Sequence, residues 1–359
     1  MSALISFLVK DKNQMNKYKV IAYCLFLLTF SISCSKDKQQ EGLSIDLLNE
    51  AKDSIGYSLF VDSIEYINLE VTDSCVIGRI KDIAIHRERL FIFDEQQQTI
   101  WIFSRAGKYL NKISRKGDGP GEYARISQFE YDDRNNQIVV LSPWKRVLMF
   151  YTTEGEFLRT VELEMRVNDF KICPQGGFIL SNSGLDDPAA GIYYADDSGK
   201  GVECLVKRKS NHLVYTTSKW ELCSYKNIIC FMAPNFDNTV YHFENKLLSI
   251  ENLFLIKPEL KHDYKKTVSL QNLEDFIRTT HLEGEKWIWT AYWSSIDDLR
   301  ILLYSKKTGK YWIGKSMIND LDGRECGAKA SVTGDNTFVT WSESDNPNDN
   351  PVLNILHLK

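Results

Sequence analysis

The chain has 359 residues, of which 43% are hydrophobic and 12% aromatic, so it can bury a sizeable core. This length exceeds that of the usual single domain, but closed all-β architectures often run as long in one unit. The formal net charge is -4 at pH 7 and the basic residues form no long run, which gives no reason to expect a nucleic-acid partner.

The N-terminal segment, residues 1–33, is typical of a bacterial signal peptide. Two lysines precede an apolar run over residues 20–32. A run of this length is too short to span a bilayer, but it suits the hydrophobic region of a signal peptide. Met15 is the better start, because the signal peptide begins there and residues 1–14 fit no part of it.

The junction that follows, Ser31-Ile32-Ser33-Cys34, resembles the lipobox of bacterial lipoproteins, although Ser31 stands where such boxes usually carry Leu. In a lipobox the cysteine is lipidated and becomes the mature N-terminus, so we expect Cys34 to carry a lipid anchor. An ordinary signal peptide cleaved nearby is the alternative. The polar stretch over residues 34–56 is then expected to be a tether, followed by the folded domain over residues 57–359.

Six cysteines remain after Cys34, and none forms a C-x-x-C pair or has a histidine at metal-ligand spacing. Cys223 and Cys230 could face each other across a hairpin and form a disulfide. The alternative is that all six are buried free thiols, which behave as small hydrophobic side chains.

Short strands recur along most of the chain. Residues 64–69 alternate apolar and polar side chains, as a half-buried strand does. Six short apolar strands follow, and they begin at residues 90, 138, 178, 228, 287 and 338, which lie 40 to 59 residues apart. Each is followed by a polar loop and a second strand. In four repeats a glycine five residues after an apolar position marks the turn into a third strand.

Repeats of this length with several short strands each are typical of a β-propeller. A β-sandwich is the alternative, but it does not explain a six-fold recurrence. We therefore predict an all-β fold: a six-bladed β-propeller with four antiparallel strands per blade. Because the last repeat ends the chain at its third strand, we expect residues 64–69 to supply its outermost strand, which closes the ring and removes two exposed sheet edges.

A glycine-rich loop lies between the first two repeats. Its residues are Gly117, Asp118, Gly119, Pro120, Gly121, Glu122 and Tyr123. The glycines permit positive φ, and the proline fixes one φ among them. No Lys-Ser/Thr pair and no helix follow, which disfavours a phosphate cradle. We interpret the loop as structural, with Tyr123 wedged between two blades and Glu122 bonded to nearby amides or an arginine.

This loop, the strand rhythm and the lipobox-like start resemble the six-bladed propeller lipoproteins of Bacteroidetes, which are similar to NHL-type propellers. The resemblance covers residues 60–359 and is thin over residues 207–272. It implies a propeller and a place in the cell envelope, with a lipid anchor in the outer membrane. For most of that family no activity is established, so the resemblance implies no particular reaction or ligand.

The loops that join the second and third strands are candidate binding loops. Alternate connections of a four-stranded meander emerge on the same side, so these loops share a face with the glycine-rich loop. They cover residues 143–146, 186–188, 235–238, 297–298 and 344–350. Loops on a rigid scaffold are the default site of binding, and Trp144 would suit stacking on a sugar or a peptide. The alternative is ordinary solvated turns, because Asp, Asn and Pro are common turn residues.

A second repeat precedes three innermost strands. Each copy has an arginine and, three residues later, a carboxylate or amide: Arg79 and Asp82, Arg125 and Gln128, Arg166 and Asp169. Residues that enter innermost strands lie near the rim of the central channel, where guanidinium groups could bind an anionic ligand. Arg125 would be the least compensated, because Gln128 is neutral. The alternative is that each arginine pairs with an acid of a neighbouring blade.

Enzyme signatures are missing: the sequence holds no G-x-S-x-G, no H-E-x-x-H and no complete Ca²⁺ loop, so we assign no catalytic residue. We expect a monomeric, cofactor-free binding module of the cell envelope whose loop face takes a small molecule, a glycan, a peptide or an envelope protein. The alternative is a hydrolase or lyase, lactonase-like or amidating-lyase-like, with a divalent metal held by Asp82, Asp169 and their neighbours. The nearby arginines argue against that metal site.

Overall fold

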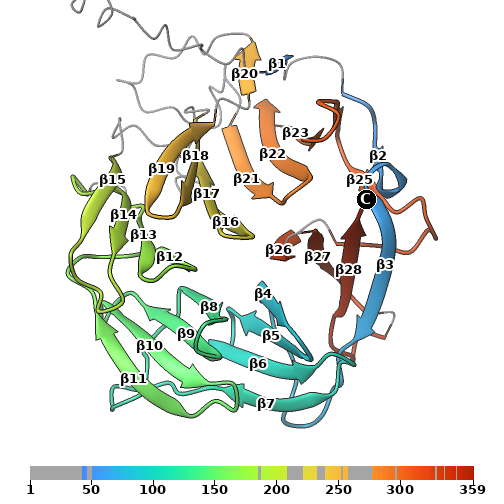
Figure 1. Cartoon of the computed structure of the whole chain (residues 1–359). Helices are drawn as coiled ribbons and strands as arrows, with labels where there is room; N and C mark the ends of the chain where they lie inside the picture. The colour runs from blue at the N-terminus through green and yellow to red at the C-terminus, as the bar shows by residue number, and fades with distance from the viewer. Residues whose placement is uncertain are drawn as a thin grey trace, which may run out of the picture. The chain divides into compact units, whose positions relative to one another are not determined.

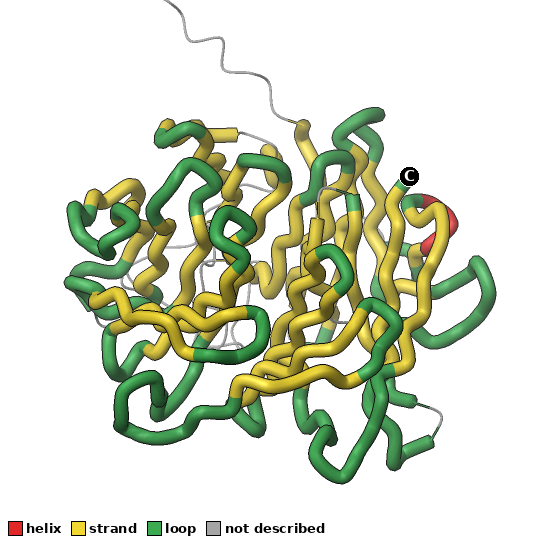
Figure 2. The backbone as a smooth tube through the Cα atoms, turned by 60° about the horizontal axis from the view of Figure 1, so that its bottom comes forward, coloured by secondary structure: helices red, strands yellow, loops and turns green. Residues whose placement is uncertain are grey.

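The computed structural model describes residues 43–46, 51–184, 187–207, 221–232, 239–251, 254–257, 277–295, 297–327, 330–334, 336–344 and 346–359. These residues form strands throughout, with one short 3-10 helix at Tyr57–Leu59 (Figure 2). Six four-stranded antiparallel sheets stand around a common centre, which confirms the predicted six-bladed propeller (Figure 1). No helix within these ranges is long and apolar enough to cross a membrane.

The first five blades are meanders of four consecutive strands, ordered from the centre outward. Blade 1 consists of β4 (Ile80–His86), β5 (Arg89–Asp94), β6 (Thr99–Ser104) and β7 (Tyr109–Ile113). Blade 2 consists of β8 (Gln128–Asp132), β9 (Gln137–Ser142), β10 (Val147–Thr152) and β11 (Phe157–Glu162). Blade 3 consists of β12 (Asp169–Ile172), β13 (Phe178–Asn182), β14 (Gly191–Ala195) and β15 (Glu203–Lys207).

Blades 4 and 5 continue the same order. Blade 4 consists of β16 (Glu221–Tyr225), β17 (Ile228–Met232), β18 (Val240–Glu244) and β19 (Leu247–Glu251). Blade 5 consists of β21 (Ile277–Glu283), β22 (Trp287–Ser295), β23 (Asp298–Ser305) and β24 (Tyr311–Gly314). The innermost strands β4, β8, β12, β16 and β21 surround the channel together with the first strand of blade 6 (Figure 1).

Blade 6 combines the two ends of the propeller. Its strands β26 (Ala330–Gly334), β27 (Thr337–Ser342) and β28 (Val352–Leu358) come from the C-terminal part, and its outermost strand is β3 (Val61–Asn68). β3 runs antiparallel to β28, with Ile67 opposite Leu353. The predicted closure of the last blade by the N-terminal strand is confirmed, so main-chain hydrogen bonds hold the ring shut.

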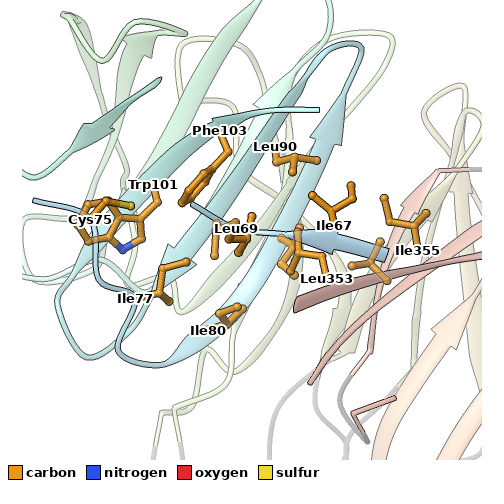
Figure 3. Packing of buried hydrophobic residues seen from close by; sticks show 13 residues of the cluster. Ile67, Leu69, Cys75, Ile77, Ile80, Leu90, Trp101, Phe103, Leu353 and Ile355 are labelled. Atoms are coloured by element: carbon orange, nitrogen blue, oxygen red, sulfur yellow. The ribbon is translucent and has the colours of Figure 1, made fainter. Parts of the chain in front are cut away.

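The middle strands are apolar on both faces because every blade packs between two others. In blade 1, residues 90–94 of β5 are all buried, whereas four of the five residues of the outermost strand β7 are at least partly exposed. Between blades 6 and 1, Ile67, Leu353 and Ile355 join one cluster with Leu90 and Trp101 (Figure 3). These continuous apolar runs are the ones that the sequence shows as a repeat.

The segment expected to be a tether, residues 34–56, is folded in its described part. β1 (Leu43–Asp46) pairs in parallel with β20 (Phe254–Lys257), and β2 (Ile55–Gly56) pairs in parallel with β25 (Met317–Ile318). Ile45 and Ile55 are buried against blade 5 and the neighbouring core, and burial of these side chains offsets the entropy of ordering the segment. The tether expectation is therefore wrong for these residues. The predicted signal peptide and Cys34 lie outside the described residues.

Cys223 and Cys230 face each other directly across β16 and β17. Both side chains are buried and their Sγ atoms lie 2.9 Å apart. All six cysteines in the described ranges are free thiols in this structure, and Cys204 is the exposed one. The two thiols thus occupy the facing positions expected from the sequence, without a bond between them.

Candidate ligand site in the central channel

Asp82 joins three blades at the wall of the channel. Its Oδ1 accepts a hydrogen bond from Ser331 Oγ of blade 6 (2.9 Å), and its Oδ2 accepts one from Gln128 Nε2 of blade 2 (2.6 Å). Its own strand adds the amide of Ile83, which donates to Oδ1 at 2.9 Å. Asp82 and Gln128 were singled out as matching positions of the repeat, and the structure brings them into direct contact.

Glu130 and Lys171 form an ion pair that bridges blades 2 and 3. Burial raises the pKa of Glu130 to about 7, the ammonium of Lys171 opposes this rise, and the negative charges of Asp82 and Asp169 add to it. Burial lowers the pKa of Lys171, but the surrounding carboxylates more than offset this and raise it above its ordinary value. The pKa values of Glu130 and Lys171 therefore depend on each other and on the charges of Asp82 and Asp169.

A cavity of about 210 Å³ opens beside this ion pair. It is lined by residues 82–86, 129–131, 133, 171 and 224–226, which belong to blades 1 to 4. At one end of the cavity lie His86, Asp133 and Lys226, where innermost strands turn into their hairpins. His86 Nδ1 lies 2.6 Å from Asp133 Oδ1, and Lys226 Nζ lies 2.6 Å from Glu285 Oε1, so both side chains have an acidic partner.

The three predicted arginines lie elsewhere. Each precedes its innermost strand, at the opposite end of that strand from the hairpin turn, and none lines the cavity. Arg79 is exposed and pairs with Glu95 at 3.1 Å; Glu95 belongs to the same blade, whereas the alternative named an acid of a neighbouring blade. The side chains of Arg125 and Arg166 are exposed and make no hydrogen bond or ion pair with another described residue. The anion site at these arginines stays a prediction.

The glycine-rich loop is held from several sides. Tyr123 is fully buried; its hydroxyl lies 3.0 Å from the carbonyl of Gln98 and accepts the amide of Arg115 at 3.1 Å. Glu122 Oε2 accepts the amide of Gly119 at 2.9 Å. Gly121 has a φ of +71°, and a Cβ there would lie 2.6 Å from the ring of Phe157. Any other residue at Gly121 is therefore disfavoured, because the backbone φ is positive and because the Phe157 ring leaves no room for a Cβ atom.

The neighbouring loop of blade 2 contacts this loop on the same face. Lys145 Nζ donates to the carbonyl of Glu122 at 2.9 Å. Next to it, Trp144 is 71% exposed, the most open of the large aromatic side chains in the described ranges. Of the other candidate loops, residues 186, 235–238 and 345 lie outside the described residues.

A second polar cluster, which the sequence did not indicate, lies between blades 4 and 5. The carboxylate of Glu283 is completely buried, contacts the ammonium of Lys306, and lies 3.0 Å from His242 Nε2 and 3.4 Å from His281 Nε2. Tyr225, which also lines the cavity, donates its hydroxyl to Glu283 at 3.3 Å. Burial raises the pKa of Glu283, but these hydrogen bonds and charges outweigh it and hold that pKa well below its ordinary value.

In the part of the chain that the structure describes, no group of side chains is arranged as a metal-binding site. Within that part, no three His, Cys, Asp or Glu side chains are placed to hold a metal ion together. Asp82 is occupied by hydrogen bonds from Ser331 and Gln128, and Asp169 Oδ1 accepts the amide of Phe170 at 2.8 Å. The two carboxylates named for the metal alternative thus act as acceptors for protein donors.

A family model described as a domain of unknown function, DUF4934, matches residues 43–357. The chain belongs to the DUF4934 family. The matched range begins at β1, so the DUF4934 domain includes the folded part of the expected tether. No curated protein matches this chain.

Solved structures share the propeller of this DUF4934 chain at low sequence identity. A protein of Bacteroides fragilis described as exported is 18% identical, covers 88% of this chain and 99% of its own, and has a TM-score of 0.69. A DUF4221 family member from Bacteroides vulgatus is 10% identical, covers 83% and 97%, and has a TM-score of 0.55. At these identities the likeness shows the fold.

Proposed function

We propose that the protein is a cell-envelope lipoprotein, anchored through Cys34, whose NHL-like propeller is a non-catalytic binding module. The lipobox-like junction and the Bacteroides propeller described as exported support the location. The observation that carries the binding role is the channel cavity, because polar side chains of four blades converge on it. Concave sites with a few convergent polar groups are the usual form of small-molecule sites.

The size of the cavity restricts the ligand. Drug-sized ligands occupy sites of roughly 300–1,000 Å³, and this cavity holds about 210 Å³. The ligand is accordingly a small polar molecule or the terminal group of a larger one, such as the end of a glycan or a peptide. Trp144 on the opposite loop face is available for a second contact with a larger partner.

A blocking variant tests the channel as the binding site. Ser224 lines the cavity and is half-buried, so Ser224→Tyr fills the space without removing a charge. Ser74→Tyr, at an exposed position, is the matched control. Binding is measured by calorimetry with monosaccharides, amino polyols and short peptides. We expect a ligand that binds the parent and the control but not Ser224→Tyr; equal binding to all three proteins would place the site outside the channel and contradict the proposal.

A further inference from the structure

The inner wall of the channel cavity carries more negative than positive charge. Two carboxylates that line the cavity, Asp82 and Glu130, and a third beside them, Asp169, act electrostatically on one ammonium, that of Lys171. At the mouth, Lys226 is paired with Glu285, and burial lowers the pKa of His86, which contacts Asp133, so neither side chain compensates the inner wall. A ligand that enters the cavity therefore meets an excess of negative potential.

Glu130 is the carboxylate that is open to a ligand. Its Oε1 receives the ammonium of Lys171, while its Oε2 has no hydrogen-bond partner among the described residues. The side chain is only 15% exposed, and what is exposed faces the cavity that Glu130 lines. Both oxygens of Asp82, by contrast, already accept hydrogen bonds from neighbouring blades.

We propose that the cavity recognises the protonated amino group of a small hydroxylated ligand, with Glu130 as the direct acceptor. This inference rests on the proposed binding function and adds the chemical class of the ligand. The ammonium supplies the positive charge that the inner wall lacks, and Ser224, whose hydroxyl makes no hydrogen bond with a described residue, donates to or accepts from a ligand hydroxyl group. A buried carboxylate beside an ammonium forms a charge-assisted hydrogen bond, which is stronger than a neutral one.

Proton release accompanies such binding. Glu130, with its pKa raised to about 7 by burial, interacts electrostatically with Lys171, Asp82 and Asp169, and it shares the cavity with the titratable side chains of His86, Tyr131, Asp133, Tyr225 and Lys226. An added ammonium favours the ionised form of Glu130, so binding lowers its pKa and expels its proton. Affinity for an amine that stays protonated should therefore rise about tenfold between pH 6 and pH 8.

The test compares an amine with its neutral counterpart. The probes are 1-amino-1-deoxyglucitol and glucitol, which differ in one amino group. Calorimetry at pH 7 in two buffers of different ionisation enthalpy counts the protons released. For the parent we expect the amine to bind about 10- to 100-fold tighter than glucitol, as a charged hydrogen bond predicts, with proton release and the rise between pH 6 and pH 8.

Glu130→Gln keeps the shape of the side chain and removes its charge. We expect it to lose the preference for the amine, the proton release and the pH dependence. Glu156→Gln, an exposed position of the same blade, should retain all three. If Glu130→Gln does not fold, the pH dependence and proton release of the parent alone decide the matter.

Two outcomes separate this inference from the proposed function. If glucitol and the amine bind the parent equally, without proton release, and Ser224→Tyr abolishes both, the channel is a binding site but the amine specificity is wrong. If neither probe binds the parent, or if Ser224→Tyr and Glu130→Gln leave amine binding unchanged, the inference is overturned.

Discussion

Closure of the ring by β3 makes the stability of the whole propeller depend on a strand near its N-terminal end. Ile67 lies on β3, is 5% exposed, and packs between blades 6 and 1 with Leu353 and Trp101. Ile67→Ala removes buried methyl and methylene groups and leaves a cavity, which costs about 2–5 kcal/mol. Whole domains are stable by only about 5–15 kcal/mol. We therefore expect a large fall in the urea concentration at the midpoint of unfolding, measured by tryptophan fluorescence.

Asp62→Ala, an exposed position on the same strand, is the control and should change stability by no more than about 0.5 kcal/mol. Deletion of residues 60–70 is the stronger test, since it also removes buried Phe60, Val61 and Leu69. At about 1.5–3 kcal/mol for each buried side chain, the loss of the four reaches about 6–12 kcal/mol, comparable to the entire stability. A soluble, monomeric deletion variant with the parent's melting temperature, or equal midpoints for the two point variants, would refute this account of closure.

Three further predictions concern other contacts. Tyr123→Phe removes the hydroxyl that satisfies buried backbone groups, so thermal unfolding should show a loss of about 1–3 kcal/mol, and an unchanged melting temperature would count against that role. Glu283→Ala leaves Lys306 without its buried partner and should cost about 3–5 kcal/mol at pH 7. Because the pKa of Glu283 is lowered on folding, its contribution is present above the unfolded value and lost as the pH falls, so the variant should lose less stability on acidification than the parent; parallel pH curves would contradict this. Cys34→Ala should move the protein out of the detergent phase in a partitioning assay, and unchanged partitioning would exclude lipidation at Cys34.

The fold was predictable because its signal is repeated six times. Each middle strand is buried on both faces, and such strands appear in sequence as short apolar runs at near-regular spacing, as in residues 90–93 and 138–141. The tether was harder to judge because the apolar stretch around Ile45 is short and flanked by charged residues, and parallel pairing of β1 and β2 with distant strands decides the burial of Ile45 and Ile55.

The site was predictable only in part. Asp82 and Gln128 stand at matching places in the repeat, and their side chains form a hydrogen bond. Glu130 and Lys171 carry a signal that can be recognised afterwards, since each is a charged residue inside an innermost strand, two positions after a residue of the repeat. A bulge between Ile80 and Asp82 shifts the alternation of β4 relative to its partner, so spacing alone does not give the direction of side chains at the channel.

The pairing of β3 with β28 also has a consequence for the order of events during biogenesis. Residues 61–68 are synthesised long before residues 352–358, and blade 6 cannot form until both are present. A chain that stops short of β28 leaves β3 without its partner strand and the ring open, with strand edges that can pair with other chains. Because contacts between residues so distant in sequence form slowly, we expect the pairing of β3 with β28 to come late in folding and to require a chain that extends through β28.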